Sequence, residues 1–221
     1  MQKKIIPQPQ VESQHYRFEN YFNFERWSSL FYQLKEIVTR SEIKSVLEVG
    51  PGTKSLEKLV GEFRPDVNYH SVDISEHINP TYIAGVTKIP VEDSSFNLVC
   101  VFQVLEHIPY EEFENAIIEL KRVSNSYVFI SLPDSTPAIR FLVKIPFFRK
   151  ISFLIKVPKP QKHVFNGQHY WEIGKSGYNL SKIKEDILKH FDIQKSYVPF
   201  ENYRHRFFIL TKKTEKNVKN I

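Results

Sequence analysis

The most informative segment of this 221-residue chain is Lys44-Ser45-Val46-Leu47-Glu48-Val49-Gly50-Pro51-Gly52-Thr53. Its apolar, β-branched run stops at a glycine, which is typical of a buried strand that ends in a turn. Gly50 permits a sharp turn, and Gly52 lets the backbone approach a ligand with no Cβ in the way. Thr53 is the expected N-cap of a helix over residues 54–62. A glycine pair alone is weak evidence for a ligand, because ordinary strand-to-helix turns also contain glycine.

Strands and helices alternate through the first two-thirds of the chain. We expect helices over residues 20–40, 54–62, 111–123 and 180–189, and strands over residues 44–50, 67–73, 82–84, 96–102, 127–132, 193–198 and 206–211. This alternation predicts an α/β fold, with a mostly parallel, doubly wound sheet of seven strands and helices on both faces. A short link joins the last two strands, so they should form an antiparallel hairpin. Residues 133–177 contain no predicted strand and are expected to cap the sheet.

Composition places the chain among globular proteins, at 41% hydrophobic and 25% charged residues. The single cysteine, Cys100, lies in an apolar run and is expected to be a small core residue. One cysteine cannot form an intrachain disulfide, which agrees with a reducing compartment. No secretory signal is apparent, and no uncharged apolar stretch approaches the ~20 residues that span a bilayer. We therefore expect a cytoplasmic protein.

A second acidic position strengthens the glycine turn. Asp73 closes the second predicted strand, 25 residues after Glu48. The carboxyl ends of parallel strands form the ligand edge of an open α/β sheet, where an acidic side chain can accept hydrogen bonds from both hydroxyls of a ribose. The alternative is an aspartate that only shapes the turn into Ile74-Ser75. The pair at this spacing is more specific than either residue by itself.

Further segments, in the same order, resemble the class I S-adenosylmethionine-dependent methyltransferases, in particular their type 11 group. Glu48, Gly50 and Gly52 match the family's acidic-x-Gly-x-Gly pattern, and Asp73 matches its acidic end of strand two. The other matching segments are Ile89–Asn97, Leu105-Glu106-His107-Ile108, Ile118–Val123 and Leu132-Pro133. Two departures are Lys54, where the family has a third glycine, and Gly85-Val86, where many members have an aspartate. The resemblance covers about Trp27 to Thr211.

The resemblance implies a Rossmann-like fold, S-adenosylmethionine as the cofactor, and a set of contacts to it. Gly50 and Gly52 would lie along its methionyl part, and Asp73 would bind its ribose. Ile74 and Val86 would flank the adenine. The remaining contacts are Gln103 and Val104 near the methionyl carboxylate and sulfur, and Glu48 at the methionyl amine through a water molecule.

The reaction implied is in-line displacement of the sulfonium methyl group, which is accelerated by holding the two reactants in line. A base is needed where the acceptor is a hydroxyl or a protonated amine. His169 is the preferred candidate and His107 the second. The polar, aromatic run Asn166–Glu172 predicts an acceptor site, to which we assign His163, Tyr170, Trp171 and Glu172. The alternative is that these histidines and Trp171 only pack the segment onto the sheet.

We expect one methyltransferase domain in five parts. They are an N-terminal tail and lid helix (1–42), a cofactor-binding core (43–132), a cap insertion (133–179), a C-terminal helix and hairpin (180–212) and a tail (213–221). In the lid helix, Trp27 and Tyr32 either close the site or pack against the sheet edge.

Net charge is +6, and residues 140–162 contain seven basic and no acidic side chains. The basic and aromatic segment 138–162 could contact a membrane surface, bind nucleic acid, or cover the site with its lysines in water. The expected acceptor is a small molecule or a sugar or glycan. A lipid-linked acceptor at the membrane is the first alternative. RNA methylation, and cofactor binding without turnover, are the others, although no RNA-binding appendage is recognisable.

Overall fold

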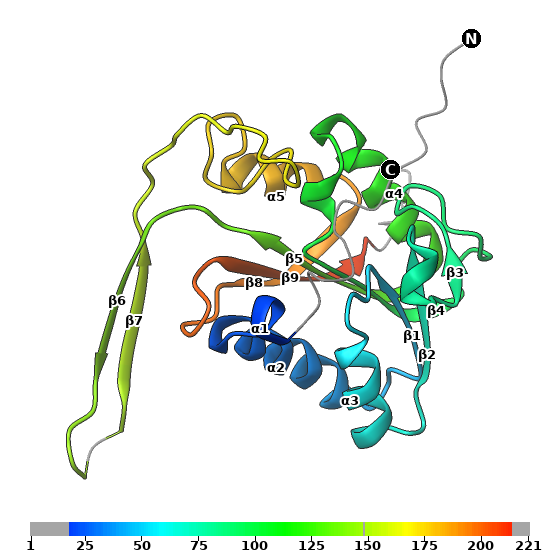
Figure 1. Cartoon of the computed structure of the whole chain (residues 1–221), viewed down its shortest axis with the longest axis horizontal. Coiled ribbons are helices and arrows are strands. Elements are labelled where there is room, and N and C mark those ends of the chain that lie inside the picture. Colours follow the sequence, from blue (N-terminus) through cyan, green and yellow to red (C-terminus); the bar gives the residue numbers. More distant parts are fainter. Residues whose placement is uncertain (1–17, 148, 214–221) are drawn as a thin grey trace, which may run out of the picture.

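A seven-stranded sheet forms the centre of the computed structural model, which describes residues 18–147 and 149–213 (Figure 1). Its strand order is β3-β2-β1-β4-β5-β9-β8. Pairing is parallel from β3 to β5, whereas β9 is antiparallel to both β5 and β8. The strands are β1 (Ser45–Val49), β2 (Asn68–Asp73), β3 (Tyr82–Ile83), β4 (Phe96–Phe102), β5 (Ser124–Pro133), β8 (Phe191–Tyr197) and β9 (His205–Lys212). The predicted fold class and the C-terminal hairpin are confirmed.

Helices cover both faces of the sheet. They are α1 (Phe18–Tyr21), α2 (Phe24–Val38), α3 (Ser55–Phe63), α4 (Phe113–Val123) and α5 (Leu180–Leu188). In Figure 1, α2 and α3 lie on one side of the sheet and α4 and α5 on the other. The sheet separates two buried apolar clusters, because neighbouring side chains in a strand point to opposite faces. In β1, Val46 packs with α2 and α3, whereas Leu47 belongs to the cluster that includes α4 and α5. Cys100 is buried, as expected.

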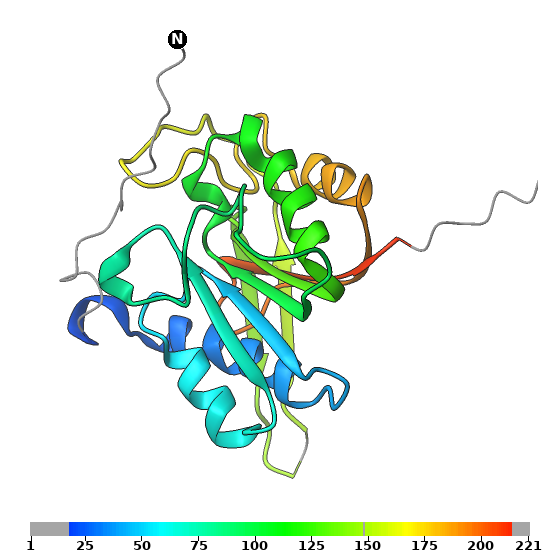
Figure 2. The same ribbon diagram turned by 90° about the vertical axis from the view of Figure 1, so that its right-hand side faces the viewer.

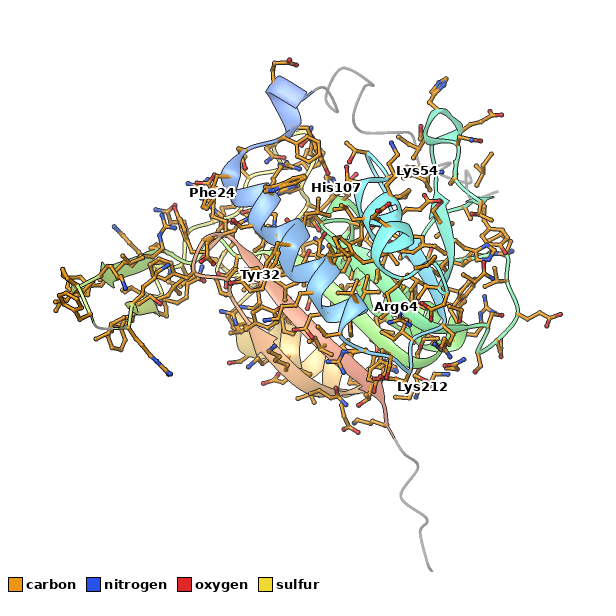
Figure 3. All side chains as sticks on the ribbon, turned by 90° about the horizontal axis from the view of Figure 1, so that it is seen from below. Phe24, Tyr32, Lys54, Arg64, His107 and Lys212 are labelled. Atoms are coloured by element: carbon orange, nitrogen blue, oxygen red, sulfur yellow. The ribbon has the colours of Figure 1, made fainter. Side chains whose placement is uncertain are left out.

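The segment 133–177 corrects one prediction, since it contains two strands of its own. β6 (Ala138–Val143) and β7 (Ile151–Lys156) form a separate antiparallel pair. This hairpin stands away from the body of the protein in Figures 1 and 3 and does not cap the sheet. The prediction was wrong because we assigned the alternating basic and apolar residues to a cap without strands. Such alternation is also typical of a β-strand. We call residues 138–156 the arm.

The helix before the sheet is also divided differently from the prediction. Asn23 separates α1 from α2, and its side chain accepts a hydrogen bond from the Arg26 backbone NH at 2.8 Å, as an N-cap does. None of the helices described is long and apolar enough to cross a membrane. Residues 1–17 of the predicted N-terminal part (1–42) and residues 214–221 of the predicted tail (213–221) lie outside the described residues. Figure 2 shows the twisted sheet between α4 and α5 on one side and α2 and α3 on the other.

Candidate functional site

A large cavity opens where β1, β2, β4 and β5 end. Its volume is about 1490 Å³, which exceeds the 300–1,000 Å³ of a usual small-ligand pocket and leaves room for two reactants. Its wall includes Gly50 and Gly52 after β1, Asp73 at the end of β2, Gln103 after β4 and Asp134 after β5. In Figure 3, Lys54 and His107 lie toward this end of the sheet, and Arg64 and Lys212 toward the other. The cavity therefore occupies the edge where ligands bind in open α/β sheets.

The glycine turn requires glycine at Gly50 for a steric reason. The φ angle there is +71°, and a Cβ would lie 2.5 Å from the Cγ2 of Val104. Gly52 also has a positive φ, of 51°. The close approach of Val104 brings the end of β4 against the turn that follows β1. Together these residues form a cradle that any larger side chain at Gly50 would fill.

The start of α3 differs from the prediction. Lys54 precedes the helix with φ at +56° and makes no side-chain cap. The Thr53 hydroxyl bonds instead to the Ser55 hydroxyl at 2.8 Å. Lys54 donates from Nζ to the Asn79 carbonyl oxygen at 2.7 Å, which ties the turn to the loop after β2. Thr53 was wrongly assigned as the N-cap because the extra left-handed residue is not visible in the sequence pattern.

Glu48 lies buried below the glycine turn. The Tyr69 hydroxyl donates to its Oε2 at 3.0 Å. Burial raises the pKa of Glu48 to about 8, and the Tyr69 hydrogen bond only partly opposes this shift. Glu48 also lines the cavity. It is therefore a carboxyl group that a cation in the cavity would bring into its ionised form.

Asp73 shapes its own turn and also faces the cavity. Its Oδ1 accepts a hydrogen bond from the Ser75 backbone NH at 2.8 Å. Burial raises the pKa of Asp73, although backbone hydrogen bonds from Ser75 and Ile74 oppose this. Asp73 therefore shapes its own turn and also lies at the cavity wall, where the ligand contact is predicted. All eight predicted cofactor contacts line the one cavity: Glu48, Gly50, Gly52, Asp73, Ile74, Val86, Gln103 and Val104.

The loop 166–172 is attached to the segment after β4 by three hydrogen bonds. The Tyr170 backbone NH donates to the Glu106 carbonyl at 2.8 Å, and the Trp171 indole NH donates to the Ile108 carbonyl at 3.2 Å. His107 Nδ1 lies 3.1 Å from the Gln168 carbonyl oxygen. The rings of His107 and His169 meet edge to face, with centroids 5.0 Å apart. These contacts bring residues about 60 positions apart in the chain to one wall of the cavity.

His169 belongs to a chain of three polar groups. Its Nδ1 lies 2.7 Å from Glu172 Oε1, and the Ser135 hydroxyl donates to Glu172 Oε2. Burial alone would raise the pKa of Glu172, but the hydrogen bonds from His169 and Ser135 lower it to about 2. Burial likewise opposes the charge of His169, yet Glu172 and Glu106 raise the pKa of His169 above 6.5. The ionised Glu172 thus orients the ring so that Nδ1 carries the proton and Nε2 is the basic nitrogen.

Glu106 is a site residue that sequence reasoning missed. Its side chain is fully buried, neither carboxylate oxygen has a hydrogen-bond partner, and burial raises its pKa to about 7. Ligand atoms of Glu106, His107 and His169 lie within 4.8 Å of one another, a grouping that could hold a metal ion. Glu106 lies in the Leu105–Ile108 segment already singled out. The sequence feature that could have identified Glu106 is its position between an apolar residue and a histidine in this segment.

Two of the predicted acceptor contacts lie elsewhere. Trp171 is completely buried among Tyr110, Phe113 and Tyr178, so its assignment to the acceptor site was wrong. Periodicity could not reveal this, because only the tertiary fold places the indole against α4. His163 is absent from the cavity wall, and its Nε2 lies 2.8 Å from the His169 carbonyl oxygen. Tyr170 and Glu172 do line the cavity.

The lid residues are also different from those expected. Trp27 is 55% exposed, and Tyr32 donates its hydroxyl to Glu201 at 3.0 Å, away from the cavity. Tyr21, Phe22 and Arg26 form that part of the wall instead. His205, another missed residue, lines the cavity and lies 3.0 Å from the Ser29 hydroxyl; burial lowers its pKa to about 3. No local pattern at the start of β9 indicated a role for it.

Comparisons with known proteins agree with this architecture. A family model described as a methyltransferase domain matches residues 14–172. No match is found among curated protein sequences. The chain is similar in structure to a protein from Pyrococcus horikoshii OT3, with a TM-score of 0.61, 14% identity, and coverage of 92% of this chain and 100% of that one.

Two further similar structures are of named methyltransferases. One is the 1,6-didemethyltoxoflavin-N1-methyltransferase of Burkholderia thailandensis with bound S-adenosylhomocysteine (TM-score 0.59, 12% identity, 86% of this chain and 82% of that one). The other is the magnesium protoporphyrin IX methyltransferase of Synechocystis PCC 6803, also with S-adenosylhomocysteine (TM-score 0.56, 14% identity, 86% and 84%). The family match covers most of the chain, which therefore belongs to the methyltransferase-domain family and is a class I S-adenosylmethionine-dependent methyltransferase.

Proposed function

We propose that this enzyme methylates a hydroxyl or amine of a small-molecule or sugar-type acceptor, which binds beside the His107 and His169 rings. One observation carries this proposal. The glycine turn and Asp73 form one part of the cavity wall, and His169 with Glu172 forms another part of the same wall. A cofactor and an acceptor can therefore share one cavity, which in-line transfer requires.

The residues present fit the cofactor. The cradle at Gly50 would receive its methionyl part, Glu48 would face its ammonium group, and Asp73 would accept from its ribose hydroxyls. Ile74 and Val86 offer apolar surface for an adenine. When bound, S-adenosylmethionine supplies an activated methyl group on a sulfonium leaving group.

His169 supports the proposal as the proton acceptor. Glu172 holds the ring through Nδ1, so that Nε2 can take the proton of the acceptor. The same carboxylate stabilises the imidazolium that results. Buried Glu106 also contributes to the raised pKa of His169, so its carboxyl group adds to the negative potential at the ring. A charged histidine is therefore tolerated in this cavity.

Replacing Asp73 tests the cofactor site. Asp73→Ala is expected to weaken binding of S-adenosylmethionine by about 1–3 kcal/mol, or roughly 10- to 100-fold in Kd, because a charged acceptor is lost. Isothermal titration calorimetry with the cofactor and with S-adenosylhomocysteine measures this. Asp73→Asn is the matched control, since it can keep the hydrogen bond from Ser75 without the charge. Absence of binding to either compound by the wild type would refute the proposed function.

The buried Glu48 makes stability depend on pH. Its pKa is about 8 in the folded chain against an ordinary 4.5, so the folded state retains a proton that the unfolded state releases. The contribution of Glu48 to the free energy of unfolding is fully present below pH 4.5 and is lost as pH rises through 8. Glu48→Gln should therefore gain stability over the wild type between these values, with a constant difference above them. Urea unfolding across this pH range measures it.

The same substitution should weaken cofactor binding, since it removes the carboxylate that faces the ammonium group. Val60→Ala, in α3 and in the same apolar cluster but absent from the cavity wall, is a control for general effects on stability. A pH profile of stability identical for Glu48→Gln and the wild type would contradict the assigned protonation.

A further inference from the structure

The arm has one face made entirely of apolar side chains. Directly opposed residues of an antiparallel pair share a face. The opposed pairs Ile139–Ile155, Phe141–Phe153 and Val143–Ile151 alternate with the pairs of the other face. Five of these six side chains are 50–63% exposed: Ile139, Phe141, Ile151, Phe153 and Ile155. We call these six side chains the apolar ladder.

The other face of the arm is held by the body of the protein. Arg140 donates to the Phe200 carbonyl at 3.1 Å and lies 4.6 Å from the Tyr203 ring centre. Lys156 Nζ lies 3.1 Å from Asp134 Oδ1. The arm is thus fixed at its base, with the apolar ladder left outward. A two-stranded hairpin is marginal in water, and a contiguous exposed apolar face of this kind marks an interaction surface.

The charge of the arm indicates which kind of partner could cover the apolar ladder. Residues 138–156 include five basic side chains and no acidic one. Lys144, Arg149 and Lys150 lie around the tip, where the Phe147 side chain is fully exposed. Aromatic and aliphatic groups beside lysine and arginine suit the boundary between anionic headgroups and acyl chains. Pairing of two arms would instead bring like charges together, which disfavours a second copy of the chain.

We infer that the arm docks this enzyme onto an anionic lipid bilayer, with the apolar ladder and Phe147 in the headgroup region. Both ends of the arm continue into the cavity wall, through Thr136 and Pro137 before it and Phe165 and Gly167 after it. Docking therefore brings the cavity close to the bilayer. On the proposed function, this favours an acceptor carried on a lipid. The inference that the chain docks on a bilayer depends only on the arm and not on the identity of the acceptor.

Vesicle flotation of the full chain tests the inference. The wild type should float with vesicles of phosphatidylcholine and phosphatidylglycerol at low salt, and much less with phosphatidylcholine alone or at high salt. Replacing the opposed pair, Phe141→Ser with Phe153→Ser, should lower the bound fraction about tenfold or more. Leu142→Ser is the matched control, because it lies on the same strand but on the other face.

A second measurement guards against misfolding of the arm variant. Phe147→Trp places a fluorophore at the tip, and its emission should shift to the blue and be quenched by brominated lipid when anionic vesicles are added. Sedimentation without lipid reports the competing outcome. A dimer that depends on the ladder, or wild-type protein that fails to float at low salt, would overturn the inference. Calorimetry with the cofactor does not depend on the arm or on lipid. Failure of docking and failure of the proposed function are therefore distinguishable.

Discussion

Trp171→Ala is expected to lower the free energy of unfolding by about 3–5 kcal/mol, the range for deleting a large buried aromatic side chain. The indole is completely buried, and it packs edge to face on both Tyr110 and Phe113, with ring centroids 5.0 and 5.2 Å apart. Its NH also donates to the Ile108 carbonyl, which would lose this partner. Chemical unfolding followed by circular dichroism measures the loss.

The neighbouring Tyr170→Ala provides the comparison for this result. Tyr170 is 39% exposed, so its truncation should cost less than about 1 kcal/mol. The original assignment of Trp171 to the acceptor site makes the opposite prediction. A Trp171→Ala variant with wild-type stability and an altered KM for the acceptor would restore that assignment.

His169→Gln is expected to reduce kcat by about 10²- to 10⁴-fold, the usual contribution of a general base. Cofactor affinity should be unchanged, because His169 lies with the loop 166–172 and not with the glycine turn. In the wild type, kcat should rise with pH through the pKa of His169, which Glu172 and Glu106 hold above 6.5, since only the neutral ring accepts a proton. This pH dependence should disappear in the variant. Turnover of an identified acceptor measures both effects.

Two controls separate this role from others. His163→Gln removes a histidine that contacts the same loop from outside the cavity, and it should keep most of the activity. Chelation of divalent metals tests the alternative use of Glu106, His107 and His169 as ligands. An activity that is lost on chelation and restored by added metal would contradict His169 as the base.

The local sequence pattern was sufficient to predict the sheet and the edge of the sheet at which a ligand would bind. Buried strands such as β4 are apolar at nearly every residue, and parallel strands must place their carboxyl ends at one edge. Glycine at Gly50 and an acidic residue at Asp73 therefore had predictable positions relative to each other. These are short-range features, because each depends on a strand and the turn directly after it.

The arm shows where local pattern was insufficient. Residues 138–156 place basic side chains among apolar ones, a pattern that fits a strand but also fits the cover for the site that we expected. Only the cross-strand register reveals that six apolar side chains share one face. A shift of one residue in one strand would divide them between the two faces.

The class of protein was predictable without the structure, because the glycine turn, Asp73 and the Leu105–Ile108 segment are each recognisable within a few residues. Tertiary structure alone decided which residues of the loop 166–172 face the cavity. Hydrogen bonds to a segment about 60 residues earlier in the chain hold this loop and place Trp171 in the core, while His169 contacts Glu172 within the loop. Tertiary packing also explains why the glycine turn tolerates no side chain at one position. Gly50 must lack a Cβ because Val104, from another strand's end, occupies the space where it would lie.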